Sequence, residues 1–257
     1  MNTKVPLDSH GFVEWLNHSG DQYTILGAAR ISTGGDAKKG KKEDFGLLRY
    51  LYKNEHLSPF EQVSFQFTVK IPHFIAKQLL RHRTFKFNEY SLRYSEAIMD
   101  MYTPSEWRRQ GNKNHQGSGD PINKDAQDLA HNIVMRAYGA SRVAYFGLLD
   151  LGVAREMART VLPLGNYTLI TFTADLRNLM HFLELRLHEH AQKEIRDVAQ
   201  AIHKMMWQHQ DLKWVMRIFD EFNSLKYSFQ KAINSCTNTE DLRGLLDQFT
   251  IDKTEEK

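Results

Sequence analysis

The residues best suited to chemistry lie in one short segment, 78–95, which is rich in basic, acidic and hydroxyl side chains. Gln78, Arg81 and His82 are three and four positions apart, so they share one face if this stretch is helical. A guanidinium group donates two parallel, charge-assisted hydrogen bonds, which suits a phosphate. The spacing therefore indicates an anion-binding face near the end of a helix.

The same segment continues with Glu89, Ser91 and Arg93, which alternate along the chain. If the chain is extended there, all three side chains point to one side. A hydroxyl and a carboxylate beside a guanidinium could hold a sugar or the edge of a base. The competing interpretation is a solvated basic turn, because runs of charge usually lie on the surface.

A second group of charged residues lies in the last third of the chain. Arg155 and Arg159 are four positions apart and share a helical face. Two further pairs are each one turn apart on a helix, Arg177 with His181 and Arg186 with His190. These two pairs are nine positions apart, so on one straight helix they lie about half a turn out of phase. Either the helix bends or breaks between them, or they serve sites shared between chains; ordinary exposed charge is the alternative.

A third feature is the stretch 56–62, which begins with His56 and contains Ser58 followed by proline. Serine before proline favours a turn, so His56 is expected at the edge of the strand that follows. A lone histidine at such a position is more often structural than catalytic.

The elements that must position these residues follow from hydrophobic periodicity. The clearest strand is 62–71, where apolar and polar residues alternate, as in an antiparallel sheet covered on one face. Two more strands are predicted at 22–26 and 167–173, and helices at 43–56, 73–83, 126–149, 154–160 and 175–214.

The remaining segments are predicted to be irregular. Residues 32–42 are typical of a loop, residues 101–125 of a polar insertion or mobile loop, and residues 249–257 of a frayed tail. Because strands and helices are segregated, we predict an α+β fold, with an antiparallel sheet flanked by long helices in a single domain over 1–257. No G-x-G-x-x-G motif follows a strand, so a Rossmann dinucleotide site is unsupported.

Composition bounds the class of protein. The 257 residues carry a formal net charge of +3, too small to indicate a nucleic-acid-binding protein by bulk charge. Cys236 is the one cysteine, so no intramolecular disulfide can form. The sequence shows no signal-peptide pattern and no apolar run of the roughly 18 residues that a transmembrane helix needs. We therefore expect a soluble, cytoplasmic protein.

Together these features resemble the ThyX family, the flavin-dependent thymidylate synthases. The family signature is R-H-R, seven residues and S, which here is Arg81-His82-Arg83 followed by Ser91. Residues 56–61 and 155–192 also resemble family segments, and 28–30 resemble the end of the family's first strand. The likeness spans roughly residues 22–206 and leaves the polar segment near 101–125 unmatched.

The resemblance implies reductive methylation of dUMP to dTMP. FAD would be bound, NADPH would reduce it, and 5,10-methylenetetrahydrofolate would donate the carbon and leave as tetrahydrofolate. No cysteine nucleophile is required, and Cys236 lies away from every cluster. Arg186 would come closest to a catalytic role by polarising the uracil electrostatically. The family is homotetrameric with active sites shared between chains, and we expect no nucleic-acid, membrane or metal partner.

The resemblance also assigns site residues by position. It gives dUMP the ligands Gln78, Glu89, Ser91, Arg93, Arg159 and Arg186. It surrounds FAD with His56, Ser58, Arg81, His82, Arg83, Asn88, Glu89, Asp175, Arg177, His181 and His190. Three positions depart from the family pattern: Lys86, where many members have serine; Gln62, where many have histidine; and His181, often asparagine. These departures concern flavin contacts and not the class of reaction.

Two other functions compete on the residues alone. Basic and aromatic residues interleave over 81–94, as in surfaces that stack on nucleic acid, but Glu89 lies inside this patch. The 12 histidines, with His188 close to His190, suggest a metal-dependent hydrolase. Residues two apart on a helix point away from each other, however, and the chain has no H-E-x-x-H motif.

Overall fold

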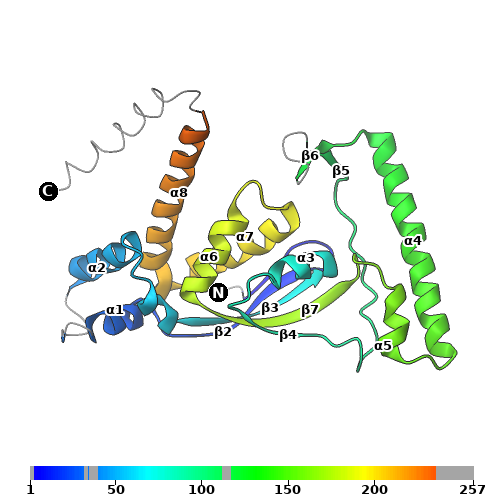
Figure 1. The fold of residues 1–257 in the computed structure, drawn as a ribbon, viewed down its shortest axis with the longest axis horizontal. Coiled ribbons are helices and arrows are strands. Elements are labelled where there is room, and N and C mark those ends of the chain that lie inside the picture. The colour runs from blue at the N-terminus through cyan, green and yellow to red at the C-terminus, as the bar shows by residue number, and fades with distance from the viewer. Residues whose placement is uncertain (1–2, 32–33, 35–39, 112–116, 236–257) are drawn as a thin grey trace.

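The fold centres on a five-stranded sheet in a computed structural model that describes residues 3–31, 34, 40–111 and 117–235. The strand order is β1-β2-β3-β7-β4, and every neighbouring pair is antiparallel (Figure 1). The strands are β1 (Lys4–Pro6), β2 (Phe12–Ser19), β3 (Ser64–Pro72), β7 (Tyr167–Asp175) and β4 (Lys86–Glu89). The predicted α+β class with an antiparallel sheet is confirmed.

The two central strands are the ones whose periodicity is clearest in the sequence. β3 and β7 pair along their whole length, so that Phe67 lies opposite Phe172 and Val69 opposite Ile170. All four of these side chains are buried. They form one apolar core with residues of α3 (His73–Leu79), α6 (Leu176–Leu187) and α7 (Lys193–Gln208), which lie over the sheet (Figure 1).

Two groups of elements extend from the ends of the sheet. At one end lie α1 (Gln22–Ile31), α2 (Lys41–Lys53), η1 (Ser58–Gln62), η3 (Gln210–Leu212) and α8 (Lys213–Ser235). At the other end lie α4 (Lys124–Asp150), α5 (Arg155–Ala158), η2 (Arg159–Val161) and the two-stranded sheet of β5 (Arg108–Gln110) and β6 (Ser118–Pro121). A buried ion pair between Arg30 and Asp44, at 2.6 Å, joins α1 to α2.

The predicted strand at 22–26 is wrong, because these residues open helix α1. Asp21 caps the helix: its Oδ1 accepts from the backbone N–H of Thr24, and the Thr24 hydroxyl accepts from the Asp21 N–H. This reciprocal pair satisfies two N–H groups that a helix start leaves without partners. Residues 28–30 consequently lie in the helix and not at the end of a strand.

Three other predictions differ from the structure. The helix at 73–83 ends at Leu79, and the helical region 175–214 is interrupted between Leu187 and Lys193. The polar segment 101–125 is not an irregular loop throughout, since it contains β5 and β6. Cys236, the tail 249–257 and most of the segment 32–42 lie outside the described residues. Within the described ranges, no helix is long and apolar enough to cross a membrane.

Candidate active site

Arg186 and His82 form a partly buried contact between α6 and the turn that follows α3. Arg186 donates from Nε to Nε2 of His82 over 3.1 Å. The His82 ring packs against Phe85 and Phe182. Burial, with the charges of Arg186 and His181, lowers the pKa of His82 to about 4. At neutral pH the imidazole is therefore uncharged and holds the guanidinium as a hydrogen-bond acceptor.

Glu89 ends strand β4 beside β7. Its Oε1 accepts a hydrogen bond of 2.9 Å from the Thr168 hydroxyl and lies 3.6 Å from Nδ1 of His73. Burial lowers the pKa of His73, and the Glu89 carboxylate opposes that effect. Among the described residues only Oε1 is engaged, so Oε2 can accept a hydrogen bond from a ligand.

Arg93 and Arg159 meet at a residue of α5 that the sequence analysis missed, Glu156. Arg93 Nε donates to Glu156 Oε2 over 3.2 Å, and Arg159 Nε donates to the Glu156 carbonyl over 3.3 Å. Ser91 lies alongside, its Oγ accepting from the Arg93 N–H at 3.3 Å. The condition that 89–93 is extended is not met after Glu89, because the Ser91 carbonyl accepts from two later N–H groups and closes a turn.

The start of α6 carries three predicted flavin residues with distinct contacts. Asp175 caps the helix, accepting from the Asn178 N–H at 2.9 Å. Arg177 forms a short hydrogen bond to Glu61 of η1. His181 is mostly exposed and lies 3.9 Å from Glu184.

One of the two alternatives for the arginine–histidine pairs was a bend or break in the helix between them, and the structure has no break there. Arg177, His181 and Arg186 all belong to the uninterrupted helix α6. The helix ends after Leu187, so His190 does not lie one helical turn beyond Arg186.

Residues 188–192 form a compact turn between α6 and α7. His188 has extended backbone, with φ −60° and ψ 143°, and its carbonyl accepts from the Ala191 N–H. Arg196 secures the turn by donating to the Glu189 carbonyl over 2.8 Å. The rings of His188 and His190 consequently lie 4.9 Å apart, so the helical argument that set them on opposite sides is wrong. No group of three possible metal ligands occurs among the described residues.

A groove of about 1130 Å³ opens beside Arg186. It runs along the end of α6, the turn that follows, and parts of α7 and α8. Its lining includes Arg186, His188, His190, Arg196, His203 and Tyr227. Arg186 and His190 were predicted site residues, whereas the α8 side of the groove was not. No periodicity in the sequence marks that side, because α8 comes next to α6 only on folding.

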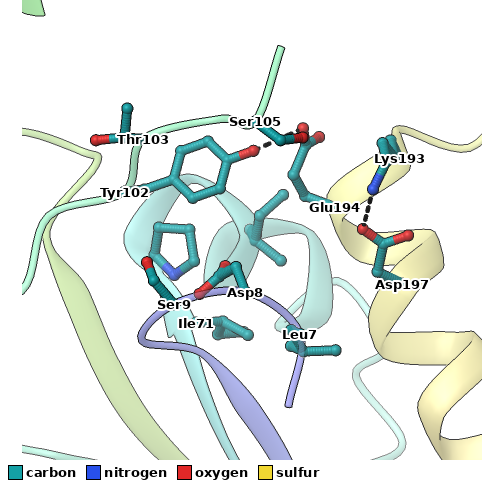
Figure 2. Close-up of a pocket in the computed structure, with 12 residues that line it drawn as sticks. Leu7, Asp8, Ser9, Ile71, Tyr102, Thr103, Ser105, Lys193, Glu194 and Asp197 are labelled. Carbon is teal, nitrogen blue, oxygen red and sulfur yellow. Dashed lines mark hydrogen bonds and ion pairs between the residues drawn. The ribbon is translucent and has the colours of Figure 1, made fainter.

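A smaller pocket of about 350 Å³ lies beyond β3, between the N-terminal loop, residues 102–105 and the start of α7. Figure 2 shows Tyr102 directed at Glu194 across the top of this pocket, with Lys193 and Asp197 paired beside it. Gln78 is connected to this region, because its Nε2 donates to Oε1 of Gln192 over 2.5 Å.

The predicted residues therefore fall into separate groups in one chain. Arg186 contacts His82, Arg93 and Arg159 share Glu156, and Arg177 contacts Glu61. Within the described part of the chain, no hydrogen bond or ion pair joins these groups directly. The remaining predicted residues are exposed on the turn after α3, on β4 and before or in η1: Arg81, Arg83, Asn88, His56 and Ser58.

The sequence of this chain is similar to a known protein family and to several of its members. The family model described as thymidylate synthase complementing protein matches residues 14–210. A flavin-dependent thymidylate synthase of Thermus thermophilus is 42% identical over 250 residues, covering 97% of this chain and 88% of the relative. The protein of the same name from Wolbachia pipientis wMel is 35% identical, covering 96% of this chain and 84% of the relative.

A solved structure resembles the fold over most of its length. The crystal structure of the UMP/dUMP methylase PolB from Streptomyces cacaoi, bound with 5-Br dUMP, matches with a TM-score of 0.76 and 34% identity. The match covers 84% of this chain and 97% of that one. A second structure of PolB, bound with 5-Br UMP, matches with a TM-score of 0.75.

Proposed function

Because the chain belongs to the flavin-dependent thymidylate synthase family, we propose that it methylates dUMP to dTMP, using FAD, NADPH and 5,10-methylenetetrahydrofolate. Tetrahydrofolate is the other product. The nucleotide substrate is supported by the similarity to PolB, a UMP/dUMP methylase crystallised with 5-Br dUMP.

The contact between Arg186 and His82 carries the proposal. Neutral His82 accepts a hydrogen bond from the Nε–H of Arg186 and so orients the guanidinium. The terminal N–H groups of Arg186 can then face the groove. A guanidinium aimed at a uracil carbonyl stabilises negative charge on the ring and makes the ring carbon more electron-rich. This activation needs no cysteine adduct.

The other proposed dUMP ligands divide by charge. Arg93 and Arg159 are exposed cations that share Glu156, and guanidinium groups of this kind suit the phosphate. Ser91 lies beside Arg93 and offers a hydroxyl. Glu89, held through Oε1, offers Oε2 to a hydroxyl or N–H of the nucleotide. Gln78 completes the set.

The proposed flavin residues fit an anionic dinucleotide by their chemistry. Arg81, Arg83 and Arg177 supply guanidinium donors for a diphosphate, and His56, His181 and His190 supply further ring donors. On binding, Arg177 either gives up its hydrogen bond to Glu61 to contact the flavin or keeps that hydrogen bond, which then holds its side chain in position. When bound, FAD supplies the redox chemistry that these side chains lack.

A homotetramer with shared active sites is part of the proposal. Helix α4 buries only Tyr145, whereas Leu129, Ile133 and Val143 have exposed fractions of 62%, 59% and 74%. Apolar side chains gathered on one helix favour contact with another copy of the chain. Several chains around one site would also bring together the groups of residues that stay separate in a single chain.

UMP is a second candidate substrate. The observation that favours it is the similarity to PolB, which is named for both nucleotides and was also solved with 5-Br UMP. A direct competition between dUMP and UMP for turnover would decide which nucleotide the site prefers.

The test is a reconstituted reaction containing dUMP, methylenetetrahydrofolate, NADPH and FAD, with each component omitted in turn. We expect dTMP only in the complete mixture. If the folded tetramer binds FAD but forms no dTMP, the substrate assignment fails. If it does not bind FAD, the cofactor assignment fails as well.

A further inference from the structure

A hydrogen-bonded series of side chains leads away from Gln78 to a carboxylate on α7. Gln78 Nε2 donates to Gln192 Oε1 over 2.5 Å, and Gln192 Nε2 donates to Glu194 Oε2 over 2.9 Å. Gln192 stands just before the first turn of α7, and Glu194 lies within it. The proposed nucleotide ligand Gln78 is thus connected through one amide to a fixed carboxylate.

Glu194 is held from the opposite side by the segment that the family resemblance left unmatched. Its Oε1 accepts from the Tyr102 hydroxyl over 2.9 Å and forms a short contact with Arg108 of β5. Figure 2 shows the Tyr102 ring directed at this carboxylate. The Glu194 side chain is only 11% exposed. Segment 101–125 therefore supplies two of the groups that fix Glu194.

The hydrogen bonds of Glu194 also settle its charge. Burial raises the pKa of a carboxyl, but here the backbone N–H, Tyr102, Gln192 and the charge of Arg108 outweigh burial and lower the pKa of Glu194. Glu194 is ionised at neutral pH, and an ionised carboxylate can only accept hydrogen bonds.

An acceptor at Glu194 dictates the direction of every bond in the series. Gln192 must present its NH₂ to Glu194 and therefore presents its carbonyl to Gln78. Gln78 must then donate its own NH₂ to Gln192, which turns its Oε1 away from Gln192. The amide of Gln78 thus has one orientation instead of two, and it offers an acceptor to the nucleotide.

We propose that Glu194 is a positioning residue for nucleotide binding, which orients Gln78 through Gln192 and is itself held by Tyr102 and Arg108. The inference rests on the proposed function, in which Gln78 is a dUMP ligand. The oriented Oε1 suits a donor of the nucleotide, such as the uracil N3–H or a ribose hydroxyl. It also gives Tyr102 and Arg108 a role at the substrate site.

The direct test replaces the obligatory acceptor with an amide of the same shape. In Glu194→Gln the series can run in either direction, so we expect the Kd for dUMP on the FAD-loaded tetramer to rise on the order of 5- to 30-fold. FAD affinity should stay unchanged. The matched control is Asp197→Asn, one turn further along α7, whose carboxylate pairs with Lys193 and not with Gln192. Wild-type dUMP affinity in Glu194→Gln would overturn the proposal.

A double-mutant cycle separates positioning from general support of the fold. If Glu194 acts through Gln78, Glu194→Gln should cost little dUMP affinity in a Gln78→Ala background. Equal losses in both backgrounds would overturn the proposal. Gln192→Leu interrupts the series and removes one hydrogen bond to Glu194, but it leaves the carboxylate in place with its contacts to Tyr102 and Arg108. It therefore tests the same series if Glu194→Gln does not fold. We expect it to reproduce the loss of affinity, and wild-type affinity would contradict the series.

Failure of the proposed function would be visible separately. If dUMP does not bind the wild-type holoenzyme, the substrate assignment is wrong before any variant is made. If wild type binds dUMP and both Glu194→Gln and Gln192→Leu bind it equally well, the substrate assignment stands and the positioning role is wrong.

Discussion

At the scale of single residues, the proposed role of Arg186 depends on its contact with His82. The guanidinium uses Nε–H on the imidazole, and both groups lie where α6 meets the turn after α3. Burial lowers the pKa of Arg186, although a guanidinium remains charged at any pH at which the protein is folded. The oriented cation is the feature on which the proposed activation of uracil depends.

Replacement of Arg186 tests this role. For Arg186→Ala we expect kcat to fall about 100- to 1000-fold, because one preorganised charge-assisted donor is lost. The partly buried side chain contributes little to the core, so the circular dichroism spectrum should not change. Arg186→Lys keeps the charge but loses the planar fork, and should recover only part of the rate. A wild-type rate for Arg186→Ala would remove this residue from the mechanism.

The neutral state of His82 predicts a pH dependence of stability. The pKa of His82 is lowered from 6.5 to about 4 in the folded protein. Between these values the unfolded chain binds more protons, so acid favours unfolding. The free energy of unfolding therefore declines as pH falls from 6.5 toward 4, and His82 contributes a slope of at most about 1.4 kcal/mol per pH unit.

The measurement compares wild type with His82→Gln, which keeps a hydrogen-bond acceptor but does not titrate. The free energy of unfolding, from denaturant titrations between pH 4 and 7, should decline less steeply in the variant. The pKa values of His73 and His18 are also lowered by burial. Both residues are present in wild type and in the variant, so their effects on the free energy of unfolding cancel when the two pH profiles are subtracted. Parallel pH profiles would contradict the assignment to His82.

At the scale of elements, helix α6 carries proposed site residues at both of its ends. Its first turn places Arg177 against Glu61 of η1, and its last turn places Arg186 against His82. Asp175 connects β7 to the helix and caps it through the Asn178 N–H. The position of every proposed site residue on α6 therefore depends on where this cap starts the helix.

Removal of the cap tests that dependence. We expect Asp175→Ala to lower the free energy of unfolding by about 1 kcal/mol, as for other helix caps. Asp175→Asn should retain most of the stability, because asparagine caps helices equally well. Chemical denaturation of both variants provides the comparison. If Asp175→Asn is stable but binds FAD weakly, the carboxylate also serves the flavin; equal stability of all three proteins would deny the capping role.

At the scale of the whole molecule, the proposed site residues lie in separate places within one chain. The arginines around Glu156 lie by α5, at one end of the sheet, and the contact between Arg177 and Glu61 lies by η1, at the other end (Figure 1). The exposed apolar residues of α4 offer a surface for another copy. Both observations favour active sites built from more than one chain.

Charge placed on α4 should dissociate such an assembly. For the double variant Leu129→Asp with Ile133→Asp we expect a smaller particle by light scattering, with loss of bound FAD and of activity. The control Asn132→Asp adds a negative charge at a neighbouring exposed polar position and should leave the assembly intact. A monomeric variant that keeps FAD would contradict shared sites, and an unchanged tetramer would exclude this face of α4 from the interface.

The sequence by itself determined the helices and strands that a hydrophobic pattern of neighbouring residues marks. The alternation in β3, the second strand β7 and the long apolar pattern of α4 predicted their positions within a few residues. The R-H-R and serine spacing identified the family, because such a motif is contiguous. Helix α1 was misassigned even though its cap, Asp21 with Thr24, was visible in the sequence.

Only the tertiary structure decided which partners the functional side chains meet. Arg177 and Glu61 are 116 positions apart, Gln78 and Gln192 are 114 apart, and Tyr102 and Glu194 are 92 apart. Periodicity reports the neighbours of a residue within a turn or a strand, and it carries no information about such distances along the chain. These pairings arise because packing of α6 and α7 over the sheet brings together segments that are remote along the chain.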